Sequence, residues 1–300
     1  MKLKFFIAIV LVLFFTTSEP TFGQQPKKLI ISTDNAAGAK LFNFFASEPD
    51  DSLALAVLLE AHKKGELEIM AITSTFGNTS GEESYQITKK QIELSGLTIP
   101  IVRGAVKAGQ TDSEAARYIA DTLRKSKEKI ILVGLGPVTD LAAVFSKYPE
   151  LKEKVEYFFL VRSGPYLIKK YWYLFSFNSL WDIKSAQFMH KLGANQFSMG
   201  EEIFKITFDN RQVKELQDIN NPMTRYITKD LLQWNRQNKI LPNKGYFLRK
   251  GNLCPWDLVW SMYLVEPNLF NIRKENNTYI LSIKNSNEFI QKTINSIKQL

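Results

Sequence analysis

The sequence predicts an α/β fold with a mostly parallel central sheet and helices on both faces. From Lys28 onward, short apolar segments alternate with segments whose apolar residues recur at helical spacing. Strand, helix and strand in succession are typical of a parallel sheet. The chain has 300 residues, 45% of them hydrophobic, which suffices for a large core. We expect residues 24–300 to form one domain, because no linker or low-complexity segment interrupts them.

Strands and helices alternate regularly along the first half of the chain, and two further helices are expected in the second half. Strands are expected at residues 29–32, 67–75, 99–103, 130–135 and 155–161. Helices are expected at residues 52–63, 82–94, 113–125, 138–146, 182–192 and 256–265. Residues 201–250 resolve less clearly and are expected to form helices and loops that cover the site. In parallel sheets the ligand site lies beyond the carboxyl ends of the strands, so candidate residues are sought there.

The first 23 residues differ from the rest. Lys2 and Lys4 precede an apolar run over residues 5–15, and a small residue, Gly23, ends the segment. This pattern is typical of a cleavable secretory signal. The run is short for a membrane span, which needs about 20 apolar residues, although an uncleaved N-terminal anchor is the alternative. We expect the protein to be exported, to the periplasm or out of the cell, with no stable membrane span after cleavage.

Charge and cysteine content exclude other classes. The formal net charge is +9, but the lysines are scattered and no basic block occurs, so nucleic acid is not an expected partner. Cys254 is the only cysteine, which excludes an internal disulfide. It is interpreted as a buried small hydrophobe. His62 and His190 lie on helical faces near lysines and are not catalytic candidates.

Four aspartates stand at the ends of expected buried elements. Asp34 follows the first strand, Asp50 and Asp51 open the first helix, and Asp257 precedes a late apolar helix. Acidic residues at a helix start can simply favour the helix. Together, however, buried carboxylates repel one another unless a hard cation lies between them, and calcium takes six to eight oxygen ligands of this kind. The aspartates therefore favour a calcium site.

Five short segments, in order, resemble the motifs of the nucleoside hydrolase superfamily over roughly residues 28–270. They are Ser32-Thr33-Asp34 followed by Asp50-Asp51, the strand ending in Gly77-Asn78, the turn beginning Leu135-Gly136-Pro137, the block Phe177-Asn178 with Asp182, and Trp256-Asp257 with Glu266-Pro267. This resemblance implies the same fold and hydrolysis of the N-glycosidic bond of nucleosides or related ribosides.

The resemblance also implies the metal site and the catalytic group. Asp34, Asp51 and Asp257 would bind Ca²⁺ together with the backbone carbonyl of Leu135. Asp34 would then act as the general base that activates a water to attack the anomeric carbon. The sugar passes through an oxocarbenium-like state, which anionic oxygens near the ring stabilise.

Four further residues are implied in substrate binding. Asp50 and Asn78 would bind ribose hydroxyls, Asn178 would lie in the sugar pocket, and Trp256 would contact the substrate. Out of this context, a turn is the favoured explanation of Asn78 after Gly77. The aromatic residues of 166–177 are explained either by loop packing or by a wall that stacks on a nucleobase.

The chain departs from the family pattern in several places. Ser32 stands where the motif begins with an aspartate, and about a dozen extra residues within 35–49 separate Asp34 from Asp50. Ser176 replaces an acid of the sugar pocket, and Trp256 replaces a histidine that helps to protonate a leaving purine. The alternatives are therefore a binding protein of the same fold with little or no turnover, or a hydrolase for another glycoside. A small-molecule nucleoside or riboside is the expected partner, and a homo-oligomer is left open.

Overall fold

The computed structural model describes residues 26–41, 45–163, 176–193, 195–199, 203, 206–240, 253–276 and 278–300. Its centre is an eight-stranded sheet with the order β5-β4-β1-β6-β7-β8-β10-β9. Every neighbouring pair is parallel except β9 and β10. The predicted α/β class is thereby confirmed. The strands are β1 (Lys27–Thr33), β4 (Leu67–Ser74), β5 (Ile101–Arg103), β6 (Ile130–Gly134), β7 (Val155–Ser163), β8 (Gln196–Met199), β9 (Phe270–Glu275) and β10 (Thr278–Ile283).

Helices cover both faces of this sheet, and a small separate hairpin follows β1. The hairpin consists of β2 (Lys40–Leu41) and β3 (Phe45–Ala46). The helices are α1 (Asp50–Lys63), α2 (Gly81–Ser95), α3 (Glu114–Lys125), α4 (Thr139–Lys147), α5 (Phe177–Trp181), α6 (Ile183–Lys191), α7 (Asn210–Ile219), α8 (Pro222–Ile240), α9 (Leu258–Val265) and α10 (Ser286–Ser296). Among the described residues, none of these helices has both the length and the apolar character needed to cross a membrane.

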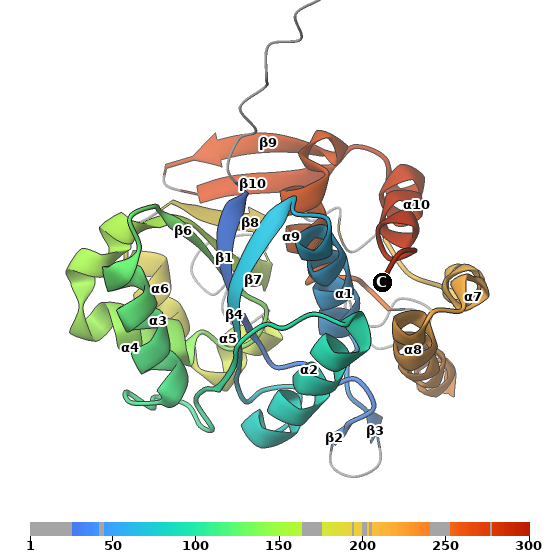
Figure 1. Ribbon diagram of the computed structural model, residues 1–300, viewed down its shortest axis with the longest axis horizontal. Coiled ribbons are helices and arrows are strands. Elements are labelled where there is room, and N and C mark those ends of the chain that lie inside the picture. Colours follow the sequence, from blue (N-terminus) through green and yellow to red (C-terminus); the bar gives the residue numbers. More distant parts are fainter. Residues whose placement is uncertain are drawn as a thin grey trace, which may run out of the picture.

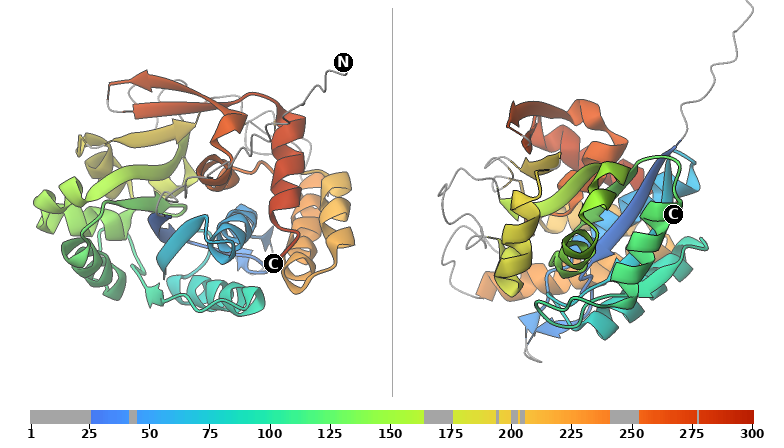
Figure 2. Two further views of the ribbon diagram at one scale, coloured as in Figure 1. Left: turned by 45° about the horizontal axis from the view of Figure 1, so that its top comes forward. Right: turned by 90° about the vertical axis from the view of Figure 1, so that its left-hand side faces the viewer.

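Two hydrophobic clusters hold the layers together. Side chains alternate across a strand, so Leu29 and Ile31 of β1 enter one cluster and Ile30 enters the other. The first cluster packs against α1, α9 and α10, and the second against α3, α4 and α6. These two groups of helices lie on opposite sides of the central strands in Figure 1. The hairpin of β9 and β10 lies at one edge of the sheet, far from α2 near the other edge (Figure 2, left).

The helix α1 is unusual because it is almost wholly buried. Every residue from Asp50 to Ala61 is buried, and the helix packs between α9 and the sheet. Pro49 precedes it, and no side chain caps its first turn. The partial positive charge of the free N–H groups there favours acidic residues. The start of α1 therefore holds Asp50 and Asp51 inside the protein.

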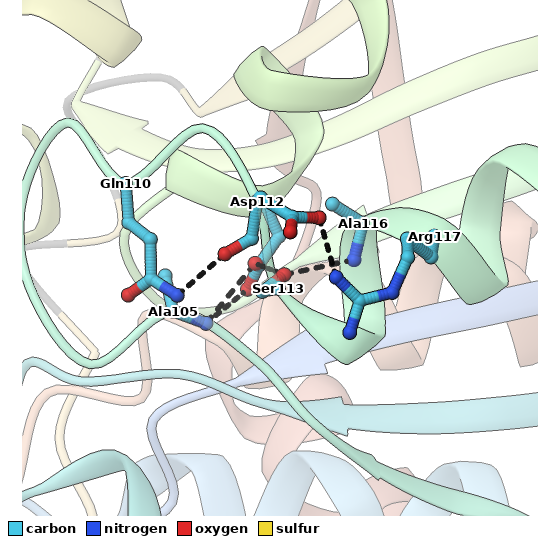
Figure 3. A network of polar contacts seen from close by, with 7 residues as sticks. Ala105, Gln110, Asp112, Ser113, Ala116 and Arg117 are labelled. Carbon is cyan, nitrogen blue, oxygen red and sulfur yellow. Dashed lines mark hydrogen bonds and ion pairs between the residues drawn. The ribbon is translucent and has the colours of Figure 1, made fainter.

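A polar network fixes the loop between β5 and α3 at the carboxyl edge of the sheet. The Asp140 carboxylate accepts hydrogen bonds from the Ala105 N–H at 3.0 Å and from the Ser113 hydroxyl at 2.5 Å. Ser113 also caps α3, because its hydroxyl accepts from the Ala116 N–H (Figure 3). Gly104 lies so close that a Cβ there would be 2.1 Å from the Ser74 carbonyl oxygen. This loop is therefore part of the scaffold.

The observed elements confirm one helix of the second half and correct another. The helix predicted over 182–192 is observed as α6, which the Asp182 side chain begins by accepting from the Ser185 N–H. The short helix α5 before it was not predicted. The helix predicted over 256–265 begins at Leu258, after a turn. The part of 201–250 that the structure describes contains α7 and α8. The predicted signal, residues 1–23, and the aromatic residues of 166–177 other than Phe177 lie outside the described residues.

Candidate active site

The predicted site residues gather beyond the carboxyl ends of three adjacent strands. In the register of the sheet, Ser32 of β1 pairs with Thr73 of β4 and with Gly134 of β6, so the three strands end at the same level. Asp34 follows β1, Asn78 follows β4 and Leu135 follows β6. The first turn of α1 and the turn before α9 contribute the remaining aspartates.

Asp34 is completely buried, and only one of its two carboxylate oxygens has a hydrogen-bond partner among the described residues. Its Oδ2 accepts a hydrogen bond from the Asn78 N–H at 2.7 Å. Its Oδ1 has no hydrogen-bond partner among the described residues. Buried carboxylate oxygens are normally paired, since an unpaired one loses its hydration without compensation. The Oδ1 atom of Asp34 is therefore available to bind a ligand, a proton or an ion.

Asp50, Asp51 and Asp257 form the centre of the site. One carboxylate oxygen from each lies within 4.8 Å of the others, and all three residues are buried. Asp50 also accepts from the Asp257 N–H at 3.3 Å, which joins the start of α1 to the turn before α9. Asp51 accepts from the Thr33 hydroxyl and, at 3.5 Å, from the Asn78 side-chain amide. This arrangement brings oxygen atoms from distant parts of the chain together.

The ionisation of these groups reflects burial and mutual repulsion. Burial, followed by the charge of Asp51, raises the pKa of Asp34 well above its ordinary value. The same two causes raise the pKa of Asp50 to about 8. Burial also raises the pKa of Asp257 well above its usual range, and the neighbouring aspartates raise it further. Burial raises the pKa of Asp51 above its ordinary value, although the hydrogen bonds from the Thr33 hydroxyl and the Asn78 amide act against this rise.

The oxygen donors fit a hard divalent cation. Several buried carboxylates, one with a free oxygen, are the ligand type that calcium prefers. The tightest group contains Asp50 with Asp51 and Asp257, whereas the resemblance implied Asp34 with Asp51 and Asp257. Asp34 adjoins the group, because Asn78 donates hydrogen bonds to both Asp34 and Asp51. The structure thus brings all four aspartates together, and the division of their roles stays a prediction.

The predicted carbonyl ligand lies in a turn beside Asp34. The Leu135 carbonyl accepts a hydrogen bond from the Asn178 side-chain amide, so these two predicted residues are in contact. The next residue, Gly136, lies against Asp34: a Cβ there would be 2.8 Å from Oδ1. Gly77 is equally close, since its Cβ would be 2.0 Å from Oδ2 at a φ of +151°. Only glycine fits at both positions.

The residues that depart from the family pattern have definite places. Ser32 is buried, and its hydroxyl has no hydrogen-bond partner among the described residues. The Ser176 hydroxyl accepts from the Ser179 N–H and caps α5. Trp256 is partly buried and packs against the large hydrophobic cluster. Neither the Ser176 hydroxyl nor the Trp256 indole can act as the acid that the family pattern has at its position.

Sequence reasoning missed residues that hold the site in shape. Thr33 bonds to Asp51, and the Ser47 hydroxyl donates to the Asn78 carbonyl at 2.9 Å. Asp182, noted only as part of a motif, accepts from the Gly109 N–H and the Thr139 hydroxyl. Burial alone would raise its pKa, but the hydrogen bonds hold the pKa of Asp182 below its ordinary value. No single-sequence signal distinguishes these residues from ordinary polar loop residues.

The fold and site define an α/β protein with a carboxylate-lined candidate metal centre at the carboxyl edge of its sheet. A sequence profile of the inosine-uridine preferring nucleoside hydrolase family matches residues 47–289. The chain belongs to this family, whose enzymes hydrolyse the N-glycosidic bond of nucleosides.

Individual relatives agree with this assignment. The pyrimidine-specific ribonucleoside hydrolase RihA of Salmonella paratyphi B is 24% identical over 250 residues, which cover 74% of this chain and 78% of that protein. The solved structure of a purine-preferring ribonucleoside hydrolase from Gardnerella vaginalis has a TM-score of 0.73 at 17% identity, covering 91% of this chain and 98% of its own. A plant nucleoside hydrolase gives 0.72 at 16% identity, covering 92% and 100%. These structural likenesses concern the fold.

Proposed function

We propose that this protein is a calcium-dependent hydrolase of nucleosides or related ribosides, with Asp34 as the general base. The observation that carries the proposal is the buried Asp34 carboxylate, whose Oδ1 lacks a partner among the described residues and adjoins three further aspartates. Oxygen ligands of this number and kind suit calcium. Asp34, Asp51, Asp257 and the Leu135 carbonyl would hold the ion, with Asp50 at its border.

Each residue of the site has its own role in the proposed reaction. A bound calcium supplies positive charge that offsets the carboxylates and eases the deprotonation of a nearby water. Asp34 takes the proton from that water at Oδ1, while the Asn78 N–H keeps the carboxylate in place through Oδ2. Asp50 and the Asn78 amide bind ribose hydroxyls. The remaining negative charge stabilises the oxocarbenium-like sugar as the bond to the base breaks.

A panel of ribonucleosides tests this function directly. The purified protein should release base from at least one purine or pyrimidine ribonucleoside, and a calcium chelator should abolish the release. The alternative is a riboside-binding protein without turnover, which the changes at Ser32, Ser176 and Trp256 favour. Such a protein would bind ribosides in calorimetry and release no base. Activity that persists in the chelator would contradict calcium dependence.

The presence of Trp256 predicts that substrates whose leaving group needs little protonation are favoured. An indole cannot donate a proton to a departing base as an imidazolium can. General-acid help typically contributes about 10²- to 10⁴-fold in rate, so its loss should be large for ordinary purines. We expect kcat/KM for p-nitrophenyl riboside, whose leaving group needs less protonation, to exceed that for inosine by far. The Trp256→His variant should narrow the gap. Equal values in the unmodified protein would reveal another acid.

We also propose that the protein is exported and that its first 23 residues are removed. The pattern of charged, apolar and small residues in that segment supports this proposal. The intact mass of the protein recovered from fractionated cells tests it. An N-terminus that still includes Lys2 would contradict cleavage.

A further inference from the structure

A cavity lies at the opposite end of the helices that begin at the aspartates. The helix α1 begins at Asp50, and α9 begins just after Asp257. Residues at the other ends of these two helices line an open cavity of about 380 Å³. Glu60, near the end of α1, comes nine residues after Asp51, which at 1.5 Å per residue is about 14 Å along the helix. The cavity is therefore separate from the candidate active site.

Glu60 is a buried carboxylate in the wall of this cavity. Only 2% of the residue is exposed, and neither of its carboxylate oxygens has a hydrogen-bond partner among the described residues. The Lys64 ammonium lies 3.2 Å from Oε1, so it offsets the charge without making a hydrogen bond. Lys64 is also exposed to solvent, which weakens this ion pair. Glu60 therefore presents acceptors that a bound donor would satisfy.

The charge around the cavity favours a cation. Its lining includes three carboxylates, Glu60, Glu66 and Glu266, and two ammonium groups, Lys64 and Lys292. Lys292 pairs with Glu266 at 3.1 Å, whereas Glu66 has no ion pair within the described part of the chain. The last turns of α1, α9 and α10 also lie at the cavity, and each helix end carries a partial charge of roughly −0.5. About two positive charges therefore suit this cavity.

The carboxylates are too far apart to hold a metal ion. Of the acidic, histidine and cysteine side chains that the structure describes, only Asp50, Asp51 and Asp257 form a group of three with ligand atoms within 4.8 Å of one another. An ammonium group instead carries three N–H donors, which do not need acceptors around a single point. Val57 and Val265 also line the cavity, and their apolar side chains suit the methylene groups of an amine.

We propose that this cavity binds a small aliphatic diamine, with one ammonium group against Glu60 and the other against Glu66. The first ammonium supplies donors to the buried carboxylate that lacks them. The methylene chain covers the apolar part of the wall, and the second ammonium meets the carboxylate that has no ion pair. The diamine site is thus a second ligand site of this protein, built from the ends of three helices.

Calorimetry with 1,4-diaminobutane tests the proposal on the full chain. Calcium is present throughout, so that the aspartates of the candidate active site are not available to the amine. The unmodified protein should bind one diamine with a Kd below about 1 mM. The uncharged analogue 1,4-butanediol should not bind. Glu60→Gln keeps the shape of the side chain and removes its charge, so it should raise the Kd for the diamine by about 10- to 100-fold.

Lys64→Met should have the opposite effect. This variant removes the cation that competes with the diamine for Oε1 of Glu60, so it should lower the Kd. It decides the proposal if Glu60→Gln does not fold, because weaker or absent binding in Lys64→Met would contradict a diamine at Glu60. Thermal unfolding shows which variants have folded.

The matched control is Asp230→Asn. Asp230 is a buried carboxylate of α8 that does not line the cavity. Its replacement should leave the Kd for the diamine within about twofold, as expected of a distant site. The proposal would be overturned by an absence of saturable heat in the unmodified protein, by equal binding of the diol, or by an unchanged Kd in Glu60→Gln. None of these measurements requires turnover, so they decide the site independently of the proposed function.

Discussion

Replacing Asp34 with asparagine should lower kcat for riboside hydrolysis by about 10²- to 10⁴-fold at saturating calcium. Asparagine has the same shape, and its side-chain oxygen can still accept the hydrogen bond that the Asn78 N–H makes at 2.7 Å. What it cannot do is take a proton from water. The loss should therefore appear in kcat when rates are measured at saturating substrate.

The pH profile separates a lost base from a damaged site. In the unmodified protein, kcat should fall at acid pH, where the base becomes protonated, and Asp34→Asn should lack this decline in its residual activity. Asp230→Asn removes another buried aspartate and should leave kcat within about twofold. If Asp34→Asn kept the activity and the acid decline of the unmodified protein, the base would have to be another residue.

The central strands could be predicted because a strand buried on both faces is a continuous apolar run in the sequence. β1, β4, β6 and β7 are apolar runs, and each was placed within two residues of its observed ends. Such runs are typical of parallel strands covered by helices on both sides. The polar residues after β1, β4 and β6 could then be assigned to one edge of the sheet, because parallel strands all end there.

The far side of the sheet was not predicted, for physical reasons. β8 has only four residues, and β9 exposes most of its side chains at the edge of the sheet. β8 is too short to show a clear period of two, and in β9 only Phe270 is buried, so burial does not alternate along it. Their places depend on pairing with β7 and with β10, which is a tertiary contact that local sequence does not contain.

The site shows the same division between local and tertiary signals. Asp50, Asp51 and Asp257 could be singled out because acidic residues next to fully apolar helices are conspicuous. Ser47 could not, since its place depends on where the insertion closes, and that closure is fixed by contacts with Asn78 and with α8. The resemblance to known motifs gives no information about such positions, because an insertion has no counterpart in those motifs.

Calcium should stabilise the folded protein, and more so at pH 8 than at pH 5. Without a cation, the raised pKa values mean that the folded state holds protons that the unfolded state releases above about pH 4. Stability should therefore fall as the pH rises from about 4 through about 8, the pKa of Asp50. In a chelator, the melting temperature should accordingly be lower at pH 8 than at pH 5.

A bound cation reverses this trend, because it favours the ionised carboxylates. At a calcium concentration about 100 times its dissociation constant, mass action adds about 2.7 kcal/mol, which for a protein of this size raises the melting temperature by about 4 °C. Asp51→Asn should reduce the calcium shift, since it removes one of the charges in the group with Asp50 and Asp257. Asp230→Asn should alter the pH dependence, because its own pKa is about 6, but should keep the full calcium shift. Scanning calorimetry of the three proteins at both pH values provides the measurement. An undiminished calcium shift in Asp51→Asn would mean that the ion binds outside these aspartates, because a carboxylate that contributes to ion binding cannot be neutralised without weakening it.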